Sequence, residues 1–269
     1  MNNLLRAEWY KLMRNKVLWI LSFIIIGLTF LLVLLQYLDH QGMFADTGVK
    51  VEIHDEATEA YPISGIKLFI ESIYSPDLFL TVVLTSVLGV YFITGEHANG
   101  TIKNLVSIGY QRSKIYFSKL ITFVSGSIML VLLFAISFAI FGALFFEIGV
   151  WPDSDLLFRT LQMLLLSWLF IIAFAAIVMF FSVIPRGTGV GLLLSIGFYF
   201  IAGAGLRMLS YKYALAEKIQ NYVVYYRYST LDVNNLSLAN VVELTMIPLC
   251  TAIIFIISGL FVLQRKDIS

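Results

Sequence analysis

The amino-acid sequence predicts an all-α integral membrane protein with six transmembrane helices. The 269-residue chain is 59% hydrophobic and only 13% charged, and its mean hydropathy is +0.89, whereas a soluble domain carries about 25% charged residues. Six long windows contain no Asp, Glu, Lys or Arg. Each has roughly the 20 apolar residues that a helix needs to cross a bilayer. Strands of a membrane barrel would instead alternate in segments of about ten residues, and these windows are continuously apolar.

The six windows define one domain over residues 1–269. The spans are expected at about 17–38, 78–94, 120–146, 161–184, 190–206 and 244–263. The segments that join them are an interfacial helix at 1–16, outer loops at 39–77 and 208–242, and a cytosolic loop at 95–119.

The distribution of charge predicts the orientation. With the N-terminus in the cytosol, eleven of the 18 basic residues and three of the 17 acidic residues lie on the cytosolic side. Basic residues near the ends of spans stay in the cytosol. Both termini are therefore expected inside.

The composition excludes several classes of function. A net charge of +1 offers no attraction for nucleic acid. The single cysteine and three widely spaced histidines predict neither a metal site nor a catalytic cluster. No Asp, Glu, Lys, Arg or His lies inside any of the six spans, and this argues against an ion-coupled carrier, whose path would need such groups. Gly95 and Gly100 have the spacing of a phosphate-binding loop, but Thr101 stands where its lysine is required.

Residues 1–16 are expected to form an amphipathic helix on the inner membrane surface. Leu5, Trp9, Leu12 and Met13 recur at helical spacing, with basic residues on the other faces. Such a helix buries its apolar side among lipids and places its basic side against anionic headgroups. A plain positive-inside anchor is the alternative, and it explains the charges but not the apolar stripe.

Two features are expected on the outer side. Ile63, Ile66, Phe69, Ile70 and Ile73 predict a helix that lies on the outer leaflet. The segment 208–242 carries six tyrosines, which suit an interfacial belt; the alternative is a partly re-entrant outer gate.

The loop 95–119 is expected to contain a short helix with one apolar face. Asn99 is suited to cap its start, and Ile102 and Leu105 supply the apolar side. Gly109 is suited to end it. Ser113 is then expected to cap the third span.

This loop resembles the signature of the type-2 ABC exporter permeases. The residues that carry the resemblance follow the second span in the order seen in that family: Glu96, Gly100, Thr101, Lys103, Arg112 and Lys119. The resemblance covers the loop closely and the six-span layout loosely. It implies a coupling helix that docks on an ATPase, with contacts from Glu96, Asn99, Gly100, Thr101, Ile102, Lys103, Leu105 and Arg112.

The resemblance implies a permease of the bacterial cell membrane that performs no chemistry itself. Two copies of an ABC ATPase subunit would bind ATP and Mg²⁺, and a second permease chain, identical or different, would complete the path through the lipid. The expected cargo is hydrophobic or amphipathic, such as an antimicrobial peptide in a peptide-export or self-immunity system. The alternatives are an ion-coupled carrier or channel, for example for sodium or drug efflux, and a non-transporting structural or regulatory membrane protein.

Overall fold

The computed structural model describes residues 2–43, 62–74, 78–98, 106–151, 153–185, 187–231 and 238–265. Within these ranges all regular structure is helical. The elements are α1 (Asn2–Met13), α2 (Lys16–His40), α3 (Gly65–Tyr74), α4 (Leu78–Ala98), α6 (Arg112–Phe145), α7 (Ser154–Val183), α8 (Thr188–Tyr199), the π-helix η2 (Phe200–Gly205), α9 (Leu206–Ser210), α10 (Ala214–Gln220), α11 (Val224–Ser229) and α12 (Leu238–Arg265).

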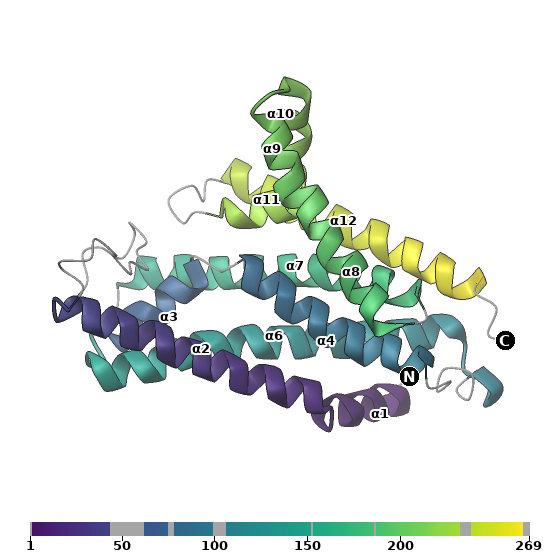
Figure 1. The fold of residues 1–269 in the computed structure, drawn as a ribbon, viewed down its shortest axis with the longest axis horizontal. Coiled ribbons are helices and arrows are strands. Elements are labelled where there is room, and N and C mark those ends of the chain that lie inside the picture. The colour runs from purple at the N-terminus through teal and green to yellow at the C-terminus, as the bar shows by residue number, and fades with distance from the viewer. Residues whose placement is uncertain are drawn as a thin grey trace.

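The prediction of an all-α membrane protein is confirmed. Among the described residues, five helical runs are long and apolar enough to cross a membrane: α2, α6, α7, the continuous run α8–η2–α9, and α12. A shorter apolar stretch, Phe79–Gly95 within α4, is the sixth. Both chain ends lie at the same end of the molecule (Figure 1), as an arrangement with both termini inside requires.

Helix α7 forms the centre of the bundle. Its most apolar window is 61% buried, against 33% or less for each of the other four long runs. Helices α4 and α12 pack along α7, and α2 packs along α6 (Figure 1). Gly89 of α4 permits a close approach to α7, because a Cβ atom there would lie 2.7 Å from the Val178 side chain. The core therefore depends on α7 and on the helices that reach it.

Helix α3 does not lie on the surface as expected. It packs against both α6 and α7, and Leu68, Ile70 and Ile73 are buried on its different sides. It also brings Lys67 and Glu71 into the bundle, where the two side chains are almost fully buried with 3.7 Å between Nζ and Oε1. The six windows carry no charge, but the interior of the protein does.

Helix α6 begins earlier than expected, at Arg112. Its N-cap is Gln111, whose side chain makes no capping hydrogen bond. Ser113, which was expected to cap this helix, therefore lies inside its first turn. The 34 residues of α6 span about 51 Å at 1.5 Å per residue. That length exceeds a bilayer core of about 30 Å, so the first turns of α6 extend beyond the core.

The six tyrosines of the segment 208–242 lie in different environments. Tyr211, Tyr213 and Tyr222 are exposed, whereas Tyr225 and Tyr228 of α11 are buried against α7. The Tyr225 ring stacks on Phe174 with 5.2 Å between the ring centroids. This segment is therefore anchored to the core through α11 rather than held only by an interfacial belt.

Candidate functional site: the start of α6 and its partners

The predicted coupling residues fall mostly outside the described part of the chain. Asn99, Gly100, Thr101, Ile102, Lys103 and Leu105 lie outside the described ranges, as does the side chain of Glu96. Glu96 belongs to the last turn of α4, and Arg112 is the first residue of α6. Gly109 has a φ of +98° and its N–H donates to the carbonyl of Val106, the left-handed conformation that glycine favours after a helical turn. The described residues on either side of this segment, at the end of α4 and at the start of α6, show how the loop is anchored.

Arg112 ties the start of α6 to the end of α12. Its Nη1 atom donates to the backbone carbonyls of Leu263 at 3.2 Å and Gln264 at 2.7 Å. The last carbonyls of a helix have no partner within the helix, and a basic side chain satisfies them well. Arg112 thus caps the end of a helix whose last carbonyls lie more than 150 residues further along the chain.

Tyr116 packs one turn further along α6. Its side chain is fully buried and lies against Gly259 of α12, where an added Cβ atom would come within 3.0 Å of Cζ and closer still to the hydroxyl. The hydroxyl oxygen has no hydrogen-bond partner in the described part of the chain. Glycine at 259 therefore lets α12 approach α6 closely at this level.

Lys119 joins α6 to α1 through a buried ion pair. Its Nζ lies 2.9 Å from Oε2 of Glu8, and the two side chains are 2% and 0% exposed. The other oxygen of Glu8 accepts a hydrogen bond from Lys11 at 3.0 Å. Lys119 also lies 5.5 Å from the centre of the Phe92 ring in α4, where a cation is attracted to the ring face. Three helices therefore meet around one ammonium group.

The apolar side of α1 completes this contact. Leu4, Glu8 and Leu12 are buried at intervals of four residues, and a Cβ atom on Gly126 of α6 would lie 3.0 Å from Leu12. Of the residues predicted to form the interfacial stripe, Leu12 is buried, Leu5 and Met13 are half-buried, and Trp9 is exposed. Sequence reasoning missed Glu8. Its position between Leu4 and Leu12 on one helical face was the signal that could have identified it.

The end of α4 is held separately. The Thr94 hydroxyl donates to the carbonyl of Ser182 in α7 at 3.0 Å, and both residues are buried. A Cβ atom on Gly191 of α8 would lie 3.1 Å from Val90 and 3.4 Å from Thr94. The loop between α4 and α6 is therefore fixed to the core at one end, and to α1 and α12 at the other.

We call the set of Glu8, Arg112, Tyr116 and Lys119 the α6 junction. No cluster of three His, Cys, Asp or Glu within the described ranges is placed to hold a metal ion. The junction joins the start of α6 to α1 through the ion pair and to α12 through Arg112 and Tyr116.

Comparison with known proteins agrees with this arrangement. A family model described as ABC-2 family transporter protein matches residues 4–203, which include α1 and the start of α6. The uncharacterized membrane protein YdbK of Bacillus subtilis (strain 168) is 38% identical over 98 residues, which are 36% of this chain and 40% of YdbK. The match thus covers less than half of that relative's length. Because the family model covers well over half of the chain, this protein belongs to the ABC-2 family of transporter proteins.

Proposed function

We propose that the chain is the membrane-spanning permease subunit of an ATP-driven exporter, with ATP and Mg²⁺ bound by a separate ATPase subunit. The observation that carries the proposal is the α6 junction, which links the end of the loop 95–119 to both α1 and α12. A loop that only connected two spans would not need a buried ion pair and a helix cap at its end. The family match supports the same assignment.

The geometry favours a lever-like mechanism. The ATPase docks on the loop through the segment 99–105 and moves it when ATP binds and is hydrolysed. Because α6 is one unbroken helix of 34 residues, the movement reaches its far end without loss. Helices α1 and α12 follow through the α6 junction, and the path opens between helices of this chain and those of a second permease chain.

A hydrophobic or amphipathic cargo, such as an antimicrobial peptide, fits the surfaces that such a pair would present. Helix α8 and its continuation are largely exposed and apolar, with Val190, Leu193 and Ile201 pointing away from the bundle. Helix α12 presents a second such face with Met246, Ile253 and Ile257. Only 11% of the most apolar window of the α8–α9 run is buried.

An ion-coupled carrier is the second candidate, because Lys67 and Glu71 place two charged groups inside the bundle. Ionisable residues at such depth often mark ion or proton pathways. Their mutual ion pair provides a structural reason for their burial, so the ATP-driven mechanism remains the better supported.

The test is transport in proteoliposomes that contain the purified chain with its ATPase. We expect transport to require ATP and to continue when an uncoupler collapses the proton gradient. The double variant Thr101→Asp/Leu105→Asp should insert normally but lose the ATPase on co-purification. Ser107→Asp, in the same loop and exposed, is the matched control. Transport that stops on adding the uncoupler at constant ATP would favour the carrier instead.

A further inference from the structure

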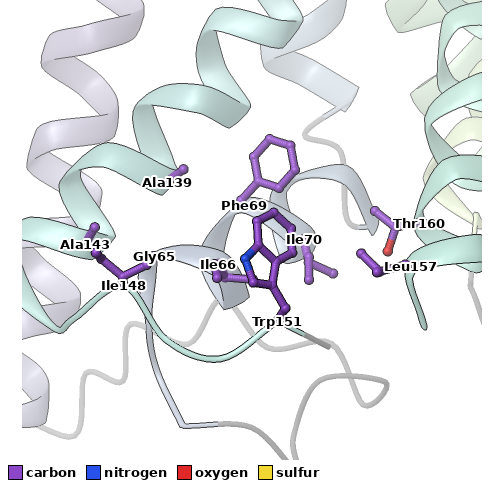
Figure 2. A pocket seen from close by; sticks show the side chains of 10 residues that line it. All are labelled: Gly65, Ile66, Phe69, Ile70, Ala139, Ala143, Ile148, Trp151, Leu157 and Thr160. Carbon is purple, nitrogen blue, oxygen red and sulfur yellow. The ribbon is translucent and has the colours of Figure 1, made fainter. Parts of the chain in front are cut away.

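A pocket of about 320 Å³ lies between α3, the end of α6 and the start of α7 (Figure 2). We call it the α3 pocket; its lining includes Gly65, Phe69, Ala139, Ala143, Trp151 and Thr160. Its volume falls in the range of about 300–1,000 Å³ that small-molecule sites occupy. It is far from the α6 junction along the bundle, and the proposed lever mechanism does not use it.

The wall of the pocket is fixed by backbone contacts. The N–H of Gly65 donates to the carbonyl of Glu147 at 2.8 Å, and the N–H of Ile66 donates to that of Ile148 at 3.1 Å. A Cβ atom at Gly65 would lie 2.6 Å from the carbonyl oxygen of Ala139. The linker after α6 is thus joined to the first turn of α3, and two alanines keep the space beneath it open.

The lining favours a hydrocarbon. The lining has two polar groups, the indole N–H of Trp151 and the hydroxyl of Thr160, and that hydroxyl donates to the carbonyl of Leu156 at 2.7 Å. A polar ligand group buried there would lose its hydrogen bonds to water with little in return. Figure 2 shows the Trp151 ring and Phe69 bounding the space from the side of the linker and of α3.

An apolar route leads from the surface into the pocket. Trp151 and Ile148 are 71% and 69% exposed although both line it. Leu157 also lines it, and Leu161 continues the apolar surface one turn further along α7. Exposed apolar side chains of the linker and of α7 therefore border the pocket on its open side.

Acidic residues outnumber basic ones around the entrance. Glu147, Asp153 and Asp155 are exposed and each stands within two residues of a lining residue in the sequence, and Arg159, also exposed, stands next to Thr160. Clustered charge of one sign raises the local concentration of the opposite ion. An acidic entrance therefore favours a positively charged head over a negative one.

We infer that the α3 pocket binds the hydrocarbon chain of a positively charged amphiphile, whose head rests against the acidic entrance. This binding goes beyond the proposed function and requires neither ATP nor the ATPase. A binding measurement on the chain alone therefore tests it independently of transport.

Trp151 is the reporter for the experiment. The full chain is placed in nanodiscs of phosphatidylcholine, and bromine-carrying dodecyltrimethylammonium is added, since bromine quenches indole fluorescence on contact. The quenching that disappears in Trp151→Phe belongs to Trp151. We expect the cationic probe to act at a concentration roughly tenfold lower than bromine-carrying dodecyl sulfate.

Two variants change the pocket without removing the reporter. Ala139→Leu fills it and should raise the required concentration of cationic probe roughly tenfold, whereas Ala214→Leu, exposed on α10, should not. Leu157→Arg places a positive charge at the entrance and should weaken the cationic probe alone. Leu165→Arg, two turns further along α7 and also exposed, is its matched control. Because Leu157→Arg changes the entrance and not the interior of the pocket, it tests the inference even if Ala139→Leu folds poorly.

The results that overturn the inference are distinct. Equal quenching by the cationic and anionic probes would show an unselective, lipid-filled crevice. Quenching that is unchanged in both Ala139→Leu and Leu157→Arg would place the probe elsewhere. Absence of quenching at Trp151 would show that no such chain enters the pocket.

Discussion

The α6 junction and the α3 pocket lie at the two ends of the same helix and are held together in opposite ways. At the junction, α6 meets α1 and α12 through a buried ion pair at 2.9 Å and a guanidinium that caps a helix end. At the pocket, α6 meets α3 through apolar side chains and two backbone hydrogen bonds from the linker. Charged contacts are directional and costly to break inside a protein, whereas apolar contacts are non-directional. The difference suits one end of α6 to transmit force and the other to accommodate a ligand.

The largest expected effect follows from removing Glu8. In Glu8→Ala, the ammonium of Lys119 stays buried without its carboxylate, which costs about 3–5 kcal/mol. We expect a melting temperature roughly 10 °C lower in detergent. Removing both buried charges in Glu8→Leu/Lys119→Met should recover most of the loss, because no buried charge is then left without its carboxylate, and Lys11 is partly exposed to solvent.

Lys11→Met is the control for this pair. It removes a half-exposed cation from the same carboxylate, and exposed pairs contribute under about 1 kcal/mol. If Lys11→Met lowers the melting temperature as much as Glu8→Ala, the buried ion pair is not what joins α1 to α6.

The second expected effect concerns the contact between Tyr116 and Gly259. Gly259→Ala forces a Cβ atom against a buried ring, and overpacking of this kind costs about 1–3 kcal/mol. Adding Tyr116→Phe should restore part of the stability, because the displaced hydroxyl has no hydrogen-bond partner within the described ranges. Thermal unfolding of the two single variants and the double variant measures the coupling.

Gly197→Ala is the matched substitution in α8. Nothing lies within 4 Å of the added Cβ atom, and alanine is favoured over glycine in a helix by about 1 kcal/mol. Gly197→Ala should therefore stabilise the protein slightly. A loss in both alanine variants would mean that glycine is needed in these helices for a reason other than the approach of α6 to α12.

The smallest expected effect is at Arg112. Arg112→Gln removes the cap on Leu263 and Gln264, and because the guanidinium is half-exposed we expect a loss of about 1 kcal/mol. Hydrogen exchange should become faster at the last turn of α12 and stay unchanged in α7. Arg159→Gln, whose side chain is exposed on α7, should leave exchange in α12 as it is in the wild type.

The spans were predictable from sequence because a charged side chain costs much free energy in lipid, so long stretches without charged residues mark the spans. The buried charges were not, because Glu8 and Lys67 sit on short helices outside the windows and only packing decides which way those helices face. The same limit applies to α3, whose apolar residues at helical spacing suit a leaflet surface and a helix interface equally well. Ser113 was expected as a cap because its side chain suits that role, but the helix begins one residue before it, at Arg112, whose side chain bonds to the end of α12.

The most direct test of the account is the amount of cargo moved per ATP hydrolysed in proteoliposomes that contain the chain and its ATPase. If the α6 junction carries the movement, the folded fraction of Glu8→Gln should keep its ATPase and hydrolyse ATP but move roughly tenfold less cargo per ATP. Glu8→Leu/Lys119→Met, which removes both buried charges, should show the same loss without the folding defect, and Lys11→Met should behave as wild type. A wild-type ratio in the stable double variant would contradict the claim that α1 and α6 move as one unit through the ion pair.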